Sequence, residues 1–184
     1  QGCTVDILEK TSQIGGIWAQ SYPKVGVQNV GTEYFFPCFP HSYTTRHPKA
    51  HELMEYFHRA VEHFHLKVFF DTEVINMEEG EDCWKLTTSL KCGPPVTRKY
   101  DYVIIATGLF GDKKQLDIPG RAQYQGEIVQ SVFTMRHDNF FEGKSIVVVG
   151  NGKTSLDMAT LAAEQGATAT HVFRTARWML PEYI

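Results

Sequence analysis

The stretch that decides the fold runs from Lys144 to Arg177 and reads KSIVVVGNGKTSLDMATLAAEQGATATHVFRTAR. Its aliphatic start, Ser145–Val149, ends at a glycine turn, as a buried strand does. A helix-forming run follows the turn, and a second strand is predicted over Thr170–Phe173. Strand, glycine turn, helix and strand in this order make one complete βαβ unit. The sequence therefore predicts a parallel pair of strands and an α/β fold.

The turn of this unit reads Gly150-Asn151-Gly152-Lys153-Thr154-Ser155, which fits G-x-G-x-x-G except that Ser155 replaces the third glycine. In a dinucleotide-binding loop the first glycine permits the tight turn and the second lets the backbone approach the pyrophosphate. The helix N-terminus then offers free N–H groups to the anion. A purely structural turn is the alternative. A Walker A loop is excluded, because its first glycine would fall at Val147, inside the strand.

The end of the second strand indicates which dinucleotide binds. An acidic residue there would favour a free ribose 2′-OH, whereas a cation would favour a 2′-phosphate. This strand ends at Arg174, with Arg177 close behind and no carboxylate nearby. Because a guanidinium can hold a phosphate through two hydrogen bonds, Arg174 favours NADPH over NADH. A solvent-facing arginine with no ligand is the alternative.

A second strand end, near the start of the chain, has the opposite chemistry. The segment TVDILEKTSQIGGIW, Thr4 to Trp18, is predicted to form a short strand that ends at Glu9. A carboxylate in this place suits an unphosphorylated ribose, and the glycine pair before Trp18 would let a loop pack against a flat ligand. Two sites of opposite preference suggest FAD together with NADPH. The matching glycine loop would lie about 20 residues before Glu9, where this sequence has not yet begun.

Between these motifs the sequence predicts mostly loop over residues 11–47 and a helix that starts at Pro48. The segments KVFFDTEVINMEE and CWKLTTSL are predicted strands, KCGPPVTRK a turn and YDYVIIATG a buried strand. This group resembles a small β-meander that ends in a core strand. The helix is predicted from apolar residues spaced three and four apart, namely Leu53, Met54, Phe57, Val61 and Phe64.

The composition is that of a soluble globular protein, with 42% apolar and 21% charged residues. A net charge of −3 provides no basic field for nucleic acid, and no apolar run is long enough to span a bilayer. Four cysteines without CxxC spacing are interpreted as reduced thiols, which favours an intracellular, cytoplasmic location. His47 and His51 could face a metal, but a solvated helix surface is the better interpretation, and no metal site is predicted.

Five segments, in order, resemble the class B flavin-dependent monooxygenases, which comprise the flavin-containing monooxygenases and their Baeyer–Villiger relatives. LEKTSQIGGIW resembles the E-x(n)-G-G-x-W segment of the family, and VQNVGTEYFFPCFP its Asn-bearing segment that ends in F-S-D-F-P. YDYVIIATG is similar to the strand ending in A-T-G, and GNGKTSLDMA to the second glycine motif. FRTARWMLP resembles the Arg-Thr…Trp…Pro run. The resemblance implies two Rossmann-like dinucleotide-binding domains, with the NADPH domain inserted in the FAD domain. Residues 1–116 are expected to form a partial FAD-binding domain and residues 117–184 a partial NADPH-binding domain. The chain is expected to be a fragment that lacks the FAD glycine loop and the C-terminal part.

The resemblance also implies roles for individual residues. Glu9 would bind the adenosine ribose of FAD, and Asn29 would act catalytically through its amide, near both flavin and nicotinamide. Arg174 would bind the 2′-phosphate of NADPH. The flavin region would be lined by Gly16, Ile17 and Trp18, with Gln28 and Val30 beside Asn29. The NADPH diphosphate region would be held by Gly150, Gly152, Thr154, Ser155 and Asp157.

The sequence departs from the family pattern at several positions. In the family's identifying stretch, which fits best from Tyr124 onward, Gln130 stands at the His position and is followed by Ser131. Thr134 stands at the terminal aromatic position, and Cys38 replaces the Asp of F-S-D-F-P. The subfamily and full activity are therefore open.

The activity implied is that of an NADPH-dependent flavin monooxygenase, similar to N,N-dimethylaniline monooxygenase, although the fragment alone is expected to retain little FAD and to be inactive. Such a monooxygenase would insert one oxygen atom of O2 into an amine or sulfide through a C4a-hydroperoxyflavin. A Baeyer–Villiger-type oxygenase acting on a ketone is one alternative, and a degenerate, non-catalytic nucleotide-binding fragment is another. A flavin disulfide reductase would need a redox cysteine pair, which the sequence lacks. Substrate, oligomeric state and membrane attachment are left open.

Overall fold

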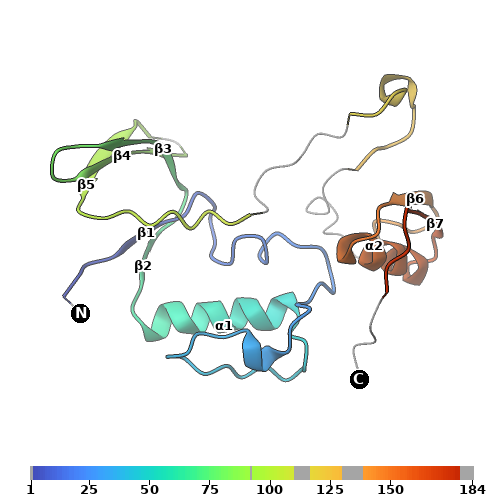
Figure 1. Ribbon diagram of the computed structural model, residues 1–184, viewed down its shortest axis with the longest axis horizontal. Coiled ribbons are helices and arrows are strands. Elements are labelled where there is room, and N and C mark those ends of the chain that lie inside the picture. Colours follow the sequence, from blue (N-terminus) through green and yellow to red (C-terminus); the bar gives the residue numbers. More distant parts are fainter. Residues whose placement is uncertain (1, 92, 110–116, 130–138, 179–184) are drawn as a thin grey trace. The chain divides into compact units, whose positions relative to one another are not determined.

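The computed structural model describes residues 2–91, 93–109, 117–129 and 139–178, which fall into two compact units (Figure 1). The first unit consists of Gln1–Gln20 and Asn29–Asp112, and the second of Ser21–Gln28 and Lys113–Ile184. The short segment Ser21–Gln28 therefore belongs with the C-terminal half of the chain. The predicted domain boundary between residues 116 and 117 adjoins residues 110–116, which lie outside the described residues.

The first unit begins with a parallel pair of short strands. β1 (Asp6–Leu8) pairs with β2 (Lys67–Phe69), with Ile7 opposite Val68. Because parallel strands need a long crossover connection, the chain between them holds the loop region, η1 (Gly31–Glu33) and α1 (Ala50–His63). The strand predicted over residues 4–8 is confirmed, although it begins two residues later, at Asp6. The mostly irregular stretch after it is confirmed too, and the helix predicted to start at Pro48 begins at Ala50.

The buried face of α1 differs in part from the predicted one. Leu53 is fully buried as expected, but its neighbours on that face are Tyr56 and Ala60, and Phe64 is exposed. Tyr56 is buried because aromatic loop residues cover it: its hydroxyl donates to the Phe39 carbonyl and accepts from the Phe36 N–H, both at 2.7 Å. Because its hydroxyl group has hydrogen-bond partners, this tyrosine can be buried in the core.

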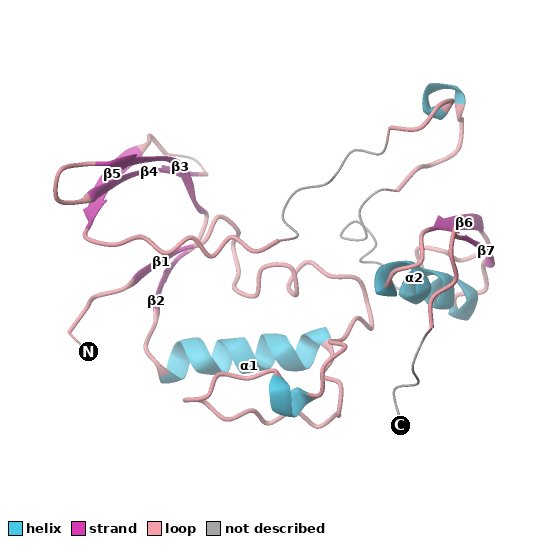
Figure 2. Cartoon of the chain, in the orientation of Figure 1, coloured by secondary structure: helices cyan, strands magenta, loops and turns pink. Residues whose placement is uncertain are grey.

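A three-stranded antiparallel meander completes the first unit (Figure 2). It consists of β3 (Thr72–Glu79), β4 (Trp84–Leu90) and β5 (Val96–Tyr100) in sequential order. The predicted single run KVFFDTEVINMEE forms two strands, since the turn before Thr72 separates β2 from β3. The predicted turn KCGPPVTRK was wrong in its second half, which enters β5. Its alternating side chains pair with β4, from Trp84 opposite Tyr100 to Thr88 opposite Val96.

The segment YDYVIIATG was predicted to be a buried strand, and this prediction was wrong. Only Tyr100 lies in a strand, and residues 101–108 have no regular structure. Ile104 is 90% exposed and Ile105 69% exposed. No strand among the described residues pairs with this segment, and an extended run without a pairing partner gains neither ladder hydrogen bonds nor packing.

The second unit contains the predicted βαβ arrangement, which is confirmed. β6 (Ser145–Val149) pairs in parallel with β7 (Thr168–Val172), with Val149 opposite Val172, and α2 (Lys153–Glu164) connects them. α2 packs against both strands. Met158, Leu161 and Ala162 are buried on this helix. β7 begins two residues earlier than predicted.

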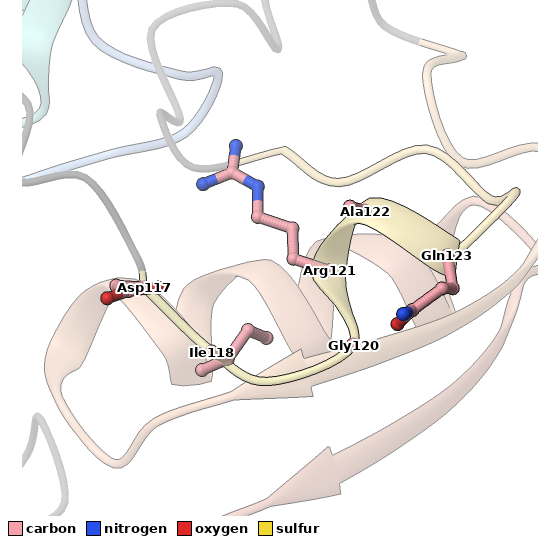
Figure 3. Close-up of a pocket in the computed structure, with 6 residues that line it drawn as sticks. All are labelled: Asp117, Ile118, Gly120, Arg121, Ala122 and Gln123. Atoms are coloured by element: carbon pink, nitrogen blue, oxygen red, sulfur yellow. The ribbon is translucent and has the colours of Figure 1, made fainter.

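The second unit also includes η2 (Arg121–Gln123), which borders a shallow surface hollow (Figure 3). A single turn of chain lines this hollow, from Asp117 to Gln123. Across the described ranges, no group of three or more His, Cys, Asp or Glu side chains is placed to hold a metal ion. Within the same residues, no helix has the length and apolar character needed to cross a bilayer.

Candidate functional site

The glycine loop between β6 and α2 is held by the conformation of Gly150. This residue has φ +134°, which side-chain-bearing residues rarely adopt, and its N–H donates to the Val172 carbonyl at 2.9 Å. The chain can therefore leave β6 and turn at once toward the start of α2. The first position of the predicted motif is thus a glycine because of the backbone conformation that it must adopt.

A glycine at position 152 is explained by space rather than by backbone angles. It is the N-cap of α2 with ordinary extended angles, φ −98° and ψ 173°, and a Cβ added there would meet no protein atom within 4 Å. The Leu156 N–H donates to the Gly152 carbonyl at 3.2 Å as the first turn closes, so the N–H groups of residues 153–155 have no partner within the helix. Open space before free N–H groups and the positive end of a helix dipole fits a diphosphate.

Two predicted residues lie in the first turn of α2. Ser155, which replaces the third glycine, turns its hydroxyl back to the Gly152 carbonyl at 2.7 Å. It therefore braces the turn from inside, while Thr154 is exposed at the helix start. Both are placed beside the open N-terminus, as their predicted contact with the diphosphate region requires.

The carboxylate of Asp157 is bound by two side chains of the protein. Its Oδ2 accepts a hydrogen bond from the Tyr22 hydroxyl at 2.5 Å and forms an ion pair with Lys153. Burial, followed by the bond to Asp157, raises the pKa of Tyr22. The exposed ion pair between Lys24 and Glu164, at 2.6 Å, is a second link between residues 21–28 and α2. Asp157 thus anchors residues 21–28 to α2, and its contact with the cofactor stays a prediction.

The end of β7 is tied to the glycine loop by two side chains that sequence reasoning missed. His171 Nε2 donates to the Gly150 carbonyl at 2.5 Å, and Asn151 Nδ2 donates to the Thr175 carbonyl at 2.7 Å. Arg174 lies on the exposed bend between these two links. The predicted 2′-phosphate residue is thereby brought to the same sheet edge as the predicted diphosphate loop.

In the first unit, Glu9 directly follows β1. Its backbone N–H extends the pairing to the Phe69 carbonyl at 2.9 Å, and its half-buried carboxylate accepts two hydrogen bonds from Thr11. The Thr11 N–H and hydroxyl both bind Oε1 at 2.7 Å. Oε2 has no hydrogen bond among the described residues, so one oxygen is fixed and the other can accept from a ribose.

The IGGIW loop is a tight turn closed by the Trp18 N–H on the Gly15 carbonyl at 3.0 Å. Gly15 has φ +103°, and a Cβ there would lie 2.2 Å from the Met54 sulfur, so this glycine lets the loop pack against α1. Gly16 faces open space and Ile17 is exposed. The Trp18 indole donates to the Tyr34 hydroxyl at 3.2 Å and meets that ring edge-on. The loop thus presents Gly16 and Ile17 outward from an anchored Trp18.

Asn29, the predicted catalytic residue, is exposed, and its amide reaches Glu33 Oε2 at 3.4 Å. Val30 caps η1, and both residues belong to the first unit. Gln28 is exposed and is the last residue of the segment that belongs to the second unit. Gln130, Ser131 and Thr134 lie outside the described residues, and the FRTARWMLP run is described only as far as Trp178.

The fold and these loops define an α/β protein of the dinucleotide-binding class. A family model described as "Pyridine nucleotide-disulphide oxidoreductase" matches residues 26–183, and the chain belongs to this family. Within it, the predicted resemblance to the class B flavin-dependent monooxygenases is confirmed.

Individual relatives agree with this placement. The chain is 28% identical over 179 residues to the FAD-binding monooxygenase tazF of Aspergillus terreus. This match covers 94% of the chain and 32% of tazF. It is 26% identical to a Baeyer-Villiger monooxygenase of Streptomyces coelicolor, over 95% of the chain and 34% of the relative. A flavin-containing monooxygenase structure from Stenotrophomonas maltophilia matches 98% of the chain and 53% of its own, with TM-score 0.83 and 16% identity. The chain spans about a third of the length of these two curated relatives.

Proposed function

We propose that this protein is an FAD- and NADPH-dependent monooxygenase that inserts one oxygen atom of O2 into a small amine or sulfide. The observation that carries the proposal is the glycine loop. Gly152, the N-cap of α2, has open space beside its backbone, and Arg174 lies at the same edge of the sheet. Relatives named as an FAD-binding monooxygenase and as a Baeyer-Villiger monooxygenase support the general class of reaction.

The second unit would bind NADPH. Gly150, Gly152, Thr154 and Ser155 would surround the diphosphate with backbone N–H groups and hydroxyls. Asp157 would act through Lys153, whose ammonium it holds at the first turn of α2. Arg174 would bind the 2′-phosphate through its guanidinium, which selects NADPH over NADH.

The first unit would bind FAD. Glu9 would accept a hydrogen bond from the adenosine ribose through its available oxygen, and Gly16, Ile17 and Trp18 would line the flavin region. Asn29, with Gln28 and Val30 beside it, would orient flavin and nicotinamide by amide hydrogen bonds rather than by proton transfer. When bound, the flavin and NADPH supply the redox chemistry, and the protein supplies binding, orientation and exclusion of water.

A Baeyer–Villiger-type oxygenase acting on a ketone is the second candidate. The Streptomyces coelicolor relative has that name, and its match covers 95% of the chain. The nature of the oxidised substrate separates the two. Three probes represent the classes, namely N,N-dimethylaniline, methyl phenyl sulfide and cyclohexanone.

The test is NADPH-dependent O2 consumption by the FAD-loaded holoenzyme, with identification of the product from each probe. An N-oxide or sulfoxide supports the proposal, and a lactone supports the Baeyer–Villiger alternative. Binding of NADPH with no oxygenated product from any probe would favour the non-catalytic alternative. The control is Asn29→Ala, which should retain NADPH affinity while losing product formation.

A further inference from the structure

We propose that Asn151 determines nucleotide specificity as a positioning residue. By bonding to the Thr175 carbonyl, it holds the bend that carries Arg174 where the guanidinium meets the 2′-phosphate. The inference rests on the proposed binding of NADPH at the second unit.

The bond joins two loops that the parallel strands bring to one edge. Asn151 follows β6 and Thr175 follows β7, and the last paired residues of these strands, Val149 and Val172, stand opposite each other. The Asn151 amide crosses this edge to the Thr175 carbonyl over 2.7 Å. A contact of this length is a full hydrogen bond rather than a loose approach.

Arg174 is thereby fixed from both sides. Upstream, the Gly150 N–H binds the Val172 carbonyl at 2.9 Å, and the His171 ring binds the Gly150 carbonyl. Downstream, Asn151 provides the fixed point at Thr175. Without it, the chain beyond Val172 would be held only on the strand side.

The bend needs this fixed point because, among the described residues, its other contact is the Phe173 ring against His171, next to the strand. Residues 173–178 have no regular structure and are exposed. The Arg174 side chain has no hydrogen bond or ion pair with any described residue, so its guanidinium is available to a phosphate. A backbone that is already in place lowers the entropy lost when a long side chain is immobilised on its ligand.

The link requires a hydrogen-bond donor at position 151. The acceptor is a backbone carbonyl, so the side chain at position 151 must donate. An aspartate of the same shape would place a carboxylate against this carbonyl and close to the bound phosphates. Asn151→Asp therefore tests the donor without changing side-chain volume.

The experiment measures dissociation constants for NADPH and NADH by calorimetry on the full chain. The variants are Asn151→Ala, Asn151→Asp, Arg174→Ala and the double variant Asn151→Ala/Arg174→Ala. Asn151→Ala should weaken NADPH binding about fivefold, the equivalent of one lost hydrogen bond, and change NADH binding less than about twofold. In the Arg174→Ala background, Asn151→Ala should have no further effect on NADPH. Asn139→Ala is the matched amide deletion, at an exposed turn of the same unit, and should bind both nucleotides normally.

An equal loss of NADPH and NADH affinity in Asn151→Ala would overturn the inference, because it would mean that the residue only supports the loop. A loss of NADPH affinity that persists in the Arg174→Ala background would overturn it too. If Arg174→Ala itself leaves the NADPH to NADH ratio unchanged, the Arg174 assignment in the proposed function is wrong. Thermal unfolding of each variant checks that the loss is not one of folding, and Asn151→Asp gives a second, isosteric measurement.

Discussion

At the scale of single residues, Gly150 and Gly152 stand two positions apart in one motif but meet different physical demands. Gly150 is needed for a backbone angle, φ +134°, while Gly152 has angles that any residue can adopt. Gly150→Ala should therefore lower the free energy of unfolding by about 1–3 kcal/mol through backbone strain. The added Cβ would itself be accommodated, at 3.5 Å from the Ser155 Cβ.

Gly152→Ala is the paired prediction. It should cost at most about 1 kcal/mol of stability, the usual penalty for alanine at an N-cap. Its methyl group would occupy the open space before the helix N-terminus, so NADPH affinity should fall at least about tenfold, equivalent to about 1.4 kcal/mol. Chemical denaturation and calorimetry measure the two quantities. Unchanged NADPH binding in Gly152→Ala would contradict the close approach of a diphosphate to this residue.

Glu52 is a buried carboxylate that holds a loop onto α1. Its oxygens accept hydrogen bonds from the N–H and hydroxyl groups of Thr44 and Thr45 and from the Lys49 N–H, at 2.6–3.3 Å. Burial alone would raise the pKa of Glu52, but the bonds from Thr45, Lys49 and Thr44 outweigh it and lower the pKa to about 2. The charged form is therefore the stabilising one.

The lowered pKa of Glu52 makes the first unit sensitive to acid. Because the folded pKa lies below the ordinary value of 4.5, the stabilisation is complete above about pH 4.5 and is lost as the pH falls toward 2. Its size is on the order of 3 kcal/mol. Glu52→Gln should lower stability at neutral pH and flatten the acid limb of the unfolding curve. Glu55→Gln, at an exposed position of the same helix, should change neither by more than about 0.5 kcal/mol.

At the scale of elements, the sequence predicted what depends on near neighbours. The β6–α2–β7 unit and the helix after Pro48 follow from spacings of a few residues, and both are confirmed. YDYVIIATG failed because an apolar run becomes a strand only if a partner pairs with it, and partners are distant in sequence. β5 was missed because Pro94 and Pro95 suggested a turn that the strand in fact follows.

The same limit applies to the candidate site. The glycine loop, Glu9 and Arg174 could be predicted, since each stands at a fixed offset from a strand end. The bonds of Tyr22 to Asp157 and of Asn151 to Thr175 could not, because they join residues 135 and 24 positions apart. No local pattern indicates which donor will meet which acceptor across such separations.

The anchoring of residues 21–28 on α2 is a property of two elements and leads to a prediction. Tyr22 is buried and donates to a carboxylate, whereas the Lys24–Glu164 pair is exposed. Tyr22→Phe should therefore cost about 1.5–3 kcal/mol, as for a hydrogen bond to a charged group. Lys24→Ala should cost less than about 1 kcal/mol and should respond to salt. Denaturation of the two variants at low and high ionic strength compares them, and equal costs would contradict the ranking.

At the scale of the whole molecule, each unit carries one of the two predicted nucleotide sites. Glu9 and the IGGIW loop belong to the first unit, and the glycine loop and Arg174 to the second. The segment Gln28–Val30 crosses the division, since Gln28 belongs to the second unit and Asn29 to the first. The residue proposed to act through its amide is thus one peptide bond from a segment that Tyr22 fixes to α2.

Two separate units should also respond separately to a ligand of one of them. A ligand at 100 times its dissociation constant stabilises the folded state it binds by about 2.7 kcal/mol. NADPH should therefore slow amide hydrogen exchange about a hundredfold in β6, α2 and β7, where exchange requires the second unit to open. The meander β3–β4–β5 has no predicted NADPH residue and serves as the internal control, so its exchange should stay unchanged. Mass spectrometry of peptic fragments with and without NADPH measures both regions at once. Equal slowing in the meander would mean that the two units open together, and no slowing at residues 150–156 would exclude the glycine loop as the nucleotide site.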